Sequence, residues 1–336
     1  MASNKSFNSP HFNAPWLTAG LRYHTLNFFY HKQFGKKIRK LSLDAGFNCP
    51  NRDGRLATGG CVYCDPESFS PSRRLKLSSI TAQLEEGIRR LSARYNVQGF
   101  VAYFQPATNT YAPVARLRSV FEEALSHSKV VGLAIGTRPD CVPDEVLDLL
   151  AELSARTFLV VEYGLQSIHN RSLDWINRGH HFDAFLDAYK RSRQRNINVG
   201  VHIILGLPGE TREDMLATAR ELAHLELHAI KLHNLYAVRN TPLAEMVAQG
   251  EVELPQFEYY IKLVVDFLEL LPPECVIDRL SGDAPPQYLV GPDWCLDKNA
   301  IRVAVETEFI RRGTYQGIKN SLFSLPPSPF PLPPLS

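Results

Sequence analysis

The chain has 336 residues, of which 44% are hydrophobic and 21% charged, and its formal net charge is +2. This is the composition of an ordinary globular protein, and the lack of any run of about 18 apolar residues excludes a membrane-spanning class. The first residues lack the apolar stretch of a secretory signal, so we expect a cytoplasmic protein with no membrane partner.

Short β-branched and aromatic runs alternate with amphipathic segments over the first 240 residues, which predicts βα units and a parallel sheet. Six such strands favour an α/β fold of the partial (β/α)6 TIM-barrel type, with a doubly wound sheet as the alternative. In either fold, functional side chains gather at the carboxyl ends of the strands. Strands are expected at 38–43, 100–105, 130–136, 158–163, 199–205 and 229–233, and helices at 79–94, 113–127, 143–154, 182–195 and 211–225.

The alternation weakens after residue 240, where further helices are expected at 256–271 and 299–312. We therefore predict an N-terminal tail over 1–21, a core barrel over 22–240, and an α/β extension over 241–320 that caps the barrel. The Pro-rich residues 321–336 are expected to form a disordered tail.

Positive charge is concentrated at the start of the chain, because residues 1–76 contain 12 Lys and Arg against 4 Asp and Glu. Such a segment could form a face that binds nucleic-acid phosphates, or it could simply be solvated, and charge alone does not separate the two interpretations. Ten of the twelve cations lie between residues 32 and 76: Lys32, Lys36, Lys37, Arg39, Lys40, Arg52, Arg55, Arg73, Arg74 and Lys76.

Three of the six cysteines, Cys49, Cys61 and Cys64, form a C-x11-C-x2-C group directly after the first expected strand. In a reducing compartment this grouping indicates metal ligands rather than disulfides. A closed zinc site needs a fourth ligand, whereas a [4Fe–4S] cluster held by three cysteines keeps one iron open to a small molecule. The spacing is compatible with both sites. Candidates for a fourth zinc ligand are Cys141, Cys295 and His31.

The cysteine loop resembles that of radical S-adenosylmethionine (SAM) enzymes, and more narrowly that of the bacterial YhcC-type subfamily, which is related to the Elongator catalytic subunit. The resemblance covers residues 22–317 and is carried first by the runs SLDAGFNCPNRDG (42–54) and GGCVYC (59–64). Ordered motifs at the expected strand ends extend it: AYFQPATNTYAP (102–113), GTRPD (136–140), EYGLQSI (162–168), ILGLPGET (204–211), KLH (231–233) and RLSGDAP (279–285).

The resemblance implies that the three loop cysteines ligate a [4Fe–4S] cluster whose fourth iron binds SAM. Among the candidate catalytic residues, Glu162 and Gln166 match positions that commonly face the ribose or the substrate. Lys231 is a candidate because a lysine inside an apolar run needs a partner or a pocket. Cys141 could donate a hydrogen atom or simply be a small buried side chain. The implied cofactor-binding positions are Tyr63, Gln105, Asn109, Glu162, Ile204, Gly206 and Leu207.

The function implied by the resemblance is reductive cleavage of SAM to a 5′-deoxyadenosyl radical, with a flavodoxin or ferredoxin as electron donor. The relation to the Elongator subunit, together with the basic first residues, favours a wobble uridine of tRNA as the substrate. The alternatives are a zinc-stabilised RNA-binding protein without catalysis and a radical SAM enzyme with a small-molecule substrate.

Overall fold

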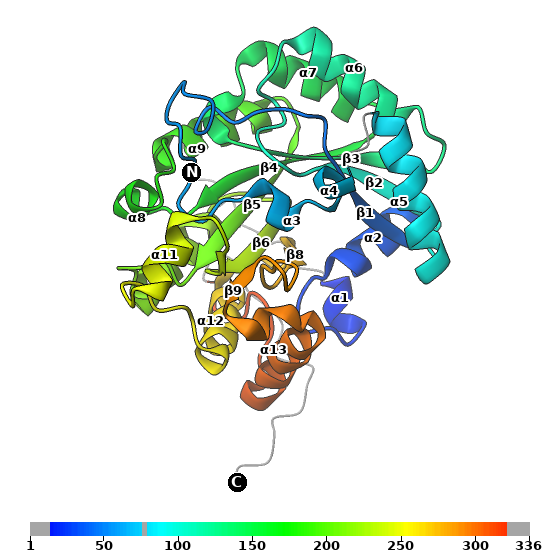
Figure 1. Cartoon of the computed structure of the whole chain (residues 1–336). Helices are drawn as coiled ribbons and strands as arrows, with labels where there is room; N and C mark the ends of the chain where they lie inside the picture. The colour runs from blue at the N-terminus through cyan, green and yellow to red at the C-terminus, as the bar shows by residue number, and fades with distance from the viewer. Residues whose placement is uncertain (1–13, 76–78, 321–336) are drawn as a thin grey trace, which may run out of the picture.

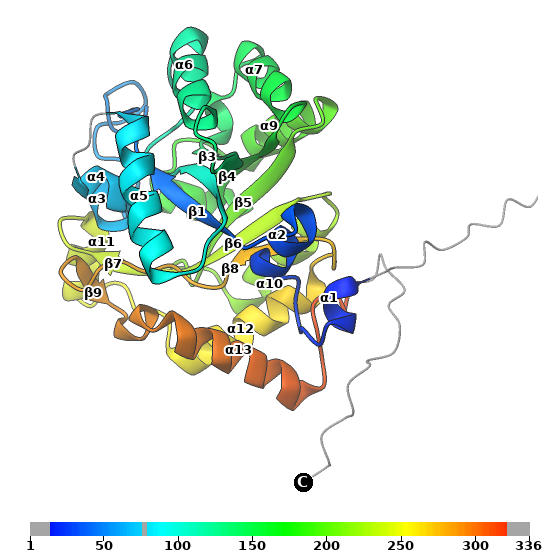
Figure 2. The same cartoon turned by 90° about the vertical axis from the view of Figure 1, so that its right-hand side faces the viewer.

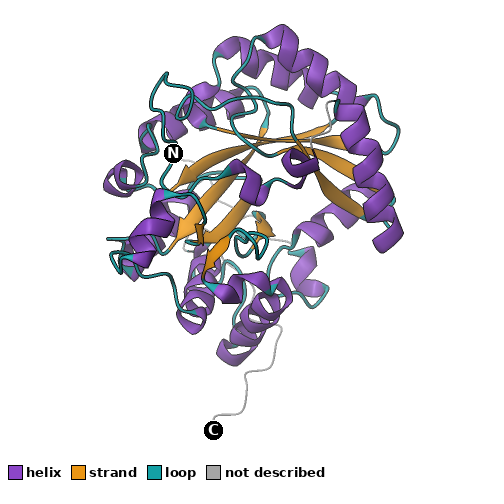
Figure 3. Cartoon of the chain, viewed as in Figure 1, coloured by secondary structure: helices purple, strands orange, loops and turns teal. Residues whose placement is uncertain are grey.

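The computed structural model describes residues 14–75 and 79–320, and its centre is a curved sheet of seven parallel strands with helices along its outside (Figures 1 and 3). The strand order is β1-β2-β3-β4-β5-β6-β8. A doubly wound sheet would reverse its order partway, so that alternative is wrong and the predicted partial barrel is confirmed. The strands are β1 (Ile38–Leu43), β2 (Gly99–Phe104), β3 (Val130–Thr137), β4 (Phe158–Gln166), β5 (Asn198–Leu205), β6 (Ala229–Asn234) and β8 (Val276–Arg279).

All six predicted strands are present, with ends within three residues of those expected. The seventh strand, β8, was not predicted, because four residues are too few to show a period. It extends the sheet in parallel beyond β6. A separate antiparallel pair is formed by β7 (Ala237–Val238) and β9 (Leu289–Gly291).

The seven predicted helices are also present, and their starts follow from local capping. The Ser79 hydroxyl accepts the N–H of Ala82, and Thr211 forms a capping box with Asp214. The shorter helices were not predicted from the sequence. The helices are α1 (Pro15–Thr18), α2 (Leu26–Phe34), α3 (Pro66–Phe69), α4 (Pro71–Leu75), α5 (Ile80–Arg94), α6 (Val114–Leu125), α7 (Asp144–Ser154), α8 (Asn170–Trp175), α9 (Phe182–Gln194), α10 (Arg212–Ala223), α11 (Pro242–Ala248), α12 (Phe257–Leu270) and α13 (Lys298–Arg312).

The core lies between the outer face of the sheet and the surrounding helices. Phe104 of β2 packs edge-on against Phe121 of α6, with ring centroids 5.1 Å apart, and both side chains are fully buried. Apolar side chains thus occupy the outer face of the strands, which leaves the inner face free to carry polar groups.

Helix α2 lies at the amino end of the barrel, close to β1 and β8 (Figure 2). Its Tyr30 packs inside the barrel against Ile38, Val101 and Val160, which come from three different strands. This apolar plug closes the amino end. The functional chemistry is therefore confined to the carboxyl end.

Residues 14–21 belong to the folded structure and are not part of a tail. Trp16 of α1 is 2% exposed, and its indole N–H donates to the carbonyl of Pro273. It also packs in one apolar cluster with Tyr315 from the far end of the chain. The expected tails over 1–13 and 321–336 lie outside the described residues. No helix in the described ranges is both long and apolar enough to cross a membrane.

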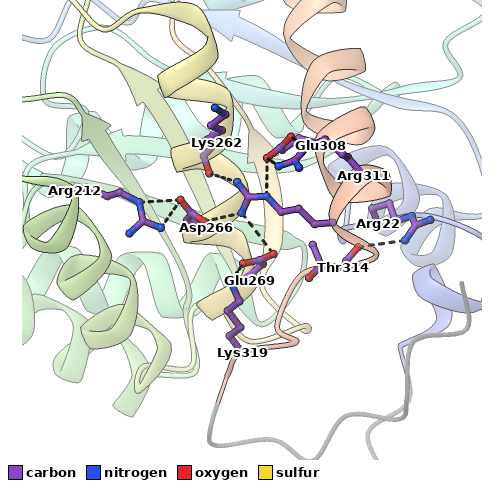
Figure 4. A network of polar contacts seen from close by, with 10 residues as sticks. Arg22, Arg212, Lys262, Asp266, Glu269, Glu308, Arg311, Thr314 and Lys319 are labelled. Carbon is purple, nitrogen blue, oxygen red and sulfur yellow. Dashed lines mark hydrogen bonds and ion pairs between the residues drawn. The ribbon is translucent and has the colours of Figure 1, made fainter. Parts of the chain in front are cut away.

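Ion pairs hold the C-terminal helices against the barrel (Figure 4). Asp266 of α12 contacts Arg212 of α10 at 2.7 Å and Arg312 of α13 at 2.6 Å. One turn further along α12, the buried Glu269 contacts Lys319. Because Asp266 joins three helices, the extension is held in a fixed position beside the core.

Candidate active site

A cavity lies at the carboxyl end of the barrel, on the opposite side from the α2 plug. Its walls come from the second halves of β2 to β6 and from the end of β8. Cys49, Cys61 and Cys64 all line this same cavity. The structure therefore brings the three loop cysteines together, where the sequence showed only their spacing.

Hydrogen bonds hold the cysteine loop, residues 49–64, against the barrel. The N–H of Cys64 donates to the carbonyl of Cys61, which makes a tight turn between the two sulfurs. The amide of Asn51 donates to the carbonyl of Asn177, and the amide of Asn177 donates back to the carbonyl of Gly60 at 2.8 Å. Gly60 has a φ of +76°, which favours glycine. The loop is thus preformed.

Two hydrogen-bond donors face the sulfur of Cys61. The Nη1 atom of Arg178 lies 3.5 Å from it, and the Nδ2 atom of Asn51 lies 3.6 Å from it. Arg178 is 7% exposed and is held in place by two hydrogen bonds to the carbonyl of Gly164. Hydrogen bonds from a buried guanidinium and an amide can stabilise negative charge on a metal-bound sulfur. The donors therefore suit a negatively charged metal–sulfur group.

Burial, helped by the neighbouring Cys61 thiol, raises the pKa of the Cys64 thiol to about 12. This cysteine stays protonated at neutral pH unless a metal displaces the proton. Within the described ranges, no three His, Cys, Asp or Glu side chains lie close enough together to hold a single metal ion. The three cysteines surround a cavity rather than one point.

The candidate fourth ligands of a zinc site lie in other parts of the described structure. Cys295 packs in a separate apolar cluster with Leu289. Cys141 lines a second cavity, together with Arg55. His31 is exposed on α2, at the closed end of the barrel. In the described structure, none of these three candidates lines the cavity that the loop cysteines share.

Five of the residues predicted to bind SAM or substrate reach the cavity. Tyr63 and Ile204 supply apolar surface, whereas Gln105 and Gln166 supply amide groups. Glu162 also lines the cavity, but its carboxylate is engaged by neighbouring cations as described below. These positions are compatible with cofactor contact, and their individual roles stay predictions.

Three predicted cofactor positions do not line the cavity in the described structure. Gly206 and Leu207 lie beyond its wall, in the turn after β5. Asn109 is fully buried, and its amide donates to the carbonyls of Phe104 and Gly136, at 3.1 and 2.8 Å. Asn109 is therefore positioned to shape the loop after β2.

A cluster of charged side chains crosses the interior of the barrel at the bottom of the cavity. Lys40 Nζ lies 2.5 Å from Glu162 Oε1 and also contacts Asp278. Lys231 contacts Glu162 and lies 3.5 Å from Asp278, and His202 Nε2 lies 2.9 Å from Glu162 Oε2. We call these five residues the charged floor. It contains two lysines and two carboxylates, so its formal charge is balanced.

The electrostatics of the charged floor follow from burial and pairing. Burial alone would raise the pKa of Glu162, but Lys231 and Lys40 hold it well below its usual range. Burial alone would lower the pKa of Lys40, but Asp278 and Glu162 raise it well above its usual value. Burial lowers the pKa of Lys231 to about 8, against the opposing effect of Asp278 and Glu162. Burial also lowers the pKa of His202, which keeps its imidazole neutral.

Lys40 and Asp278 were missed as site residues. They stand on β1 and β8, the two edge strands of the open sheet, so their ion pair spans the gap that the strands leave. Lys40 follows Arg39 in β1, so the signal that identified Lys231, a lysine in an apolar strand, was weaker for Lys40. Arg178 had no comparable signal in the sequence.

The cations of residues 32–74 do not gather on one face of the described structure. Lys40 is buried in the charged floor, and Arg73 is ion-paired with Asp44 at 2.7 Å. Lys37 precedes β1 at the closed amino end of the barrel, whereas Arg52 lines the cavity at the open end. Lys76 lies outside the described residues. The cations are thus divided between the two ends of the barrel.

An open parallel barrel with three cysteines on the loop after its first strand defines the class of radical SAM proteins. Comparison with known families agrees: the model of the radical SAM superfamily matches residues 51–222, and that of the Radical_SAM C-terminal domain matches residues 227–311. The chain belongs to the radical SAM superfamily.

The similar proteins confirm the resemblance to the YhcC-type subfamily. YtqA of Bacillus subtilis is 41% identical over 303 residues, which cover 90% of this chain and 94% of YtqA. YhcC of Escherichia coli K12 is 38% identical over 79% of this chain and 84% of its own length. At lower similarity, the tRNA uridine(34) acetyltransferase of Methanocaldococcus jannaschii is 26% identical over 48% of this chain and 30% of its own.

Among solved structures, the archaeal Elp3 of Methanocaldococcus infernus superimposes with a TM-score of 0.62. It shares 18% sequence identity, and the match covers 83% of this chain and 64% of the Elp3 chain. This similarity shows that the two proteins share a fold.

Proposed function

We propose that this chain holds a [4Fe–4S] cluster on Cys49, Cys61 and Cys64 and uses it with SAM to modify a wobble uridine of tRNA. The observation that carries the cofactor assignment is the convergence of the three loop cysteines on one cavity at the open end of the barrel. In this superfamily, the cluster and SAM together supply a 5′-deoxyadenosyl radical that removes a hydrogen atom from the substrate.

The residues around the cavity would orient the cofactors. Arg178 and Asn51 direct N–H groups at the sulfur of Cys61, which would stabilise the negative charge of a ligated cluster. Tyr63 and Ile204 offer apolar surface for the adenine of SAM. Fixed donors and apolar walls position both groups before the reaction begins.

The charged floor would close the barrel beneath the reacting groups and control protons there. Glu162 is held by two lysines and a histidine, so it stays ionised and fixed. Lys231 has a pKa of about 8, so this residue can release or accept a proton near neutral pH. A closed site excludes water, which would otherwise compete with the substrate.

Support for a tRNA substrate comes from the similar proteins and from charge. One of them is named as a tRNA uridine(34) acetyltransferase, and the matched part covers 30% of that protein, so acetyl transfer is not part of the proposal. At the open end, the cysteine loop presents the exposed Arg52 and Arg55, which can contact phosphates. We propose that a flavodoxin or ferredoxin supplies the electron.

Anaerobic purification followed by metal, sulfide and product analysis tests the cofactor assignment. We expect brown protein with iron and sulfide, which cleaves SAM to 5′-deoxyadenosine and methionine when reduced. Colourless protein that contains zinc would support the zinc-stabilised RNA-binding alternative instead. The substrate is tested by comparing the modified nucleosides of tRNA from cells with and without the gene. Unchanged tRNA together with SAM cleavage would indicate a small-molecule substrate.

A further inference from the structure

Cations gather at the amino end of the first three strands, away from the cavity. They come from the start of β1, from the end of α5 and from the turn before β3: Lys36, Lys37, Arg39, Arg94 and Lys129. We call these five residues the amino-edge patch. The segments that carry them, residues 32–43, 87–121 and 124–139, contain no Asp or Glu, so the chain supplies no neighbouring negative charge there.

Backbone contacts bring these cations to one edge of the barrel. The N–H of Gln98 donates to the carbonyl of Lys37 at 2.9 Å, and the N–H of Lys37 donates to the side chain of Gln98 at 3.1 Å. On the other side of β2, the N–H of Phe100 donates to the carbonyl of Lys129 at 2.8 Å. The starts of the three strands are therefore side by side.

Two arginines of the patch contact the same aromatic ring. The Cζ atoms of Arg39 and Arg94 lie 4.9 and 5.2 Å from the ring centroid of Tyr95. Among the described residues, no carboxylate forms an ion pair with any of the five cations. The Nε atom of Arg39 is buried and has no hydrogen-bond partner in the described chain. Like charges held together without a carboxylate favour the binding of an anion.

The surface of the patch is charged without being apolar. Lys37, Arg94 and Lys129 are exposed. None of the large apolar side chains exposed on the described surface belongs to the segments that carry the patch. Protein and membrane partners are normally held by apolar contacts as well as by charge. Charge alone fits the phosphate backbone of a nucleic acid.

We propose that the amino-edge patch binds the phosphate backbone of the tRNA, outside the cavity that takes the wobble base. This inference rests on the proposed function and adds a second binding surface to it. Four residues separate Arg39 from Leu43 at the far end of β1, a distance of roughly 13 Å along the strand. An RNA helix is much longer, since a single small domain can bind along about 16 base pairs. One tRNA molecule can therefore reach both places.

Filter binding of tRNA to anaerobic holoenzyme at several salt concentrations tests the patch. Each phosphate contact that is lost weakens binding and releases fewer counterions. Arg39→Gln with Arg94→Gln should therefore raise Kd about tenfold and lower the slope of log Kd against log salt by about two. In turnover with tRNA from a strain that lacks the gene, the loss should appear in KM rather than in kcat, because the patch lies outside the cavity.

A second variant separates phosphate binding from local packing, because Arg39 also packs on Tyr95. Lys37→Gln with Lys129→Gln removes two exposed cations and keeps the contacts of Tyr95 intact. We expect the same change in Kd and in the salt slope. Both variants are compared with the wild type at equal iron content.

The control is Arg118→Gln with Arg193→Gln, which changes the net charge by the same amount. Arg118 is paired with Glu152 at 2.6 Å and Arg193 with Glu226 at 2.7 Å. Because these arginines are balanced by carboxylates and lie outside the patch, tRNA affinity should stay within about twofold of the wild type at physiological salt.

The outcomes distinguish the patch from the proposed function. Unchanged affinity and slope in both patch variants, with tRNA still modified by the wild type, would overturn the patch and leave the proposed function intact. A wild type that neither binds nor modifies tRNA would overturn both. Sedimentation with vesicles that contain phosphatidylglycerol, lost in the patch variants while their tRNA affinity is unchanged, would identify an anionic membrane as the partner and overturn the RNA assignment.

Discussion

Replacing Lys40 by methionine should destabilise the barrel far more than replacing an exposed lysine. Lys40 lies between Glu162 and Asp278, and the three side chains are 13%, 3% and 7% exposed. Methionine keeps the length of the side chain and removes its charge. Lys231 would then be the one lysine left in the charged floor to balance two buried carboxylates.

We expect Lys40→Met to lower the free energy of unfolding by about 3–5 kcal/mol, the range found when one partner of a buried ion pair is removed. The double variant Lys40→Met with Asp278→Asn leaves one lysine facing one carboxylate, Glu162. It should therefore be more stable than the single variant and recover at least half of the loss.

The loss should also depend on pH. In the wild type, the lowered pKa of Glu162 contributes stability that is present above the usual carboxyl value of 4.5 and is lost only as pH falls through the lower folded value. Without Lys40, Glu162 loses one of the two lysines that lower its pKa, so the pKa of Glu162 rises. Acidification from about pH 7 to about pH 5 should then protonate Glu162 in the variant and narrow the difference in unfolding free energy between variant and wild type.

Urea unfolding followed by circular dichroism, on samples of equal iron content, measures these differences. The control is Lys37→Met, because Lys37 is exposed before β1 and its replacement should change stability by less than about 0.5 kcal/mol. A Lys40→Met variant as stable as the wild type would refute the reasoning. So would a double variant that is less stable than the single one.

Three further predictions concern the cluster, the extension and the substrate. Cys61→Ala should lose most of the bound iron in metal analysis, whereas Cys275→Ala should keep it. Full iron content in Cys61→Ala would remove Cys61 from the ligand set. Asp266→Ala should lower stability by about 2 kcal/mol in urea unfolding, because it removes a carboxylate that pairs with both Arg212 and Arg312. An unchanged midpoint would contradict this. For about six phosphate contacts, tRNA affinity should fall by roughly three orders of magnitude between 50 and 200 mM salt, and Arg52→Gln with Arg55→Gln should reduce this slope in filter binding; a salt-independent affinity would argue against tRNA.

The sequence alone determined where six of the strands, the main helices and the cysteine loop lie along the chain. These features are local: a buried strand such as β2 is a continuous apolar run, and a helix such as α10 begins at a capping box visible as Thr211 and Asp214. The motifs at the strand ends indicated membership of the radical SAM superfamily for the same reason. Each is a short run of residues in which neighbours in sequence are neighbours in space.

Only the tertiary structure decided which charged side chains meet. Lys40 looked like part of a basic surface because its neighbours in sequence are cations, but its side chain points into the barrel toward Glu162 and Asp278. These partners are 122 and 238 residues away along the chain. Arg178 likewise reaches the sulfur of Cys61 from 117 residues away. Sequence periodicity identifies which residues are buried, but closure of the barrel sets the distances between them, and those distances determine the charge balance and the pKa values of the site.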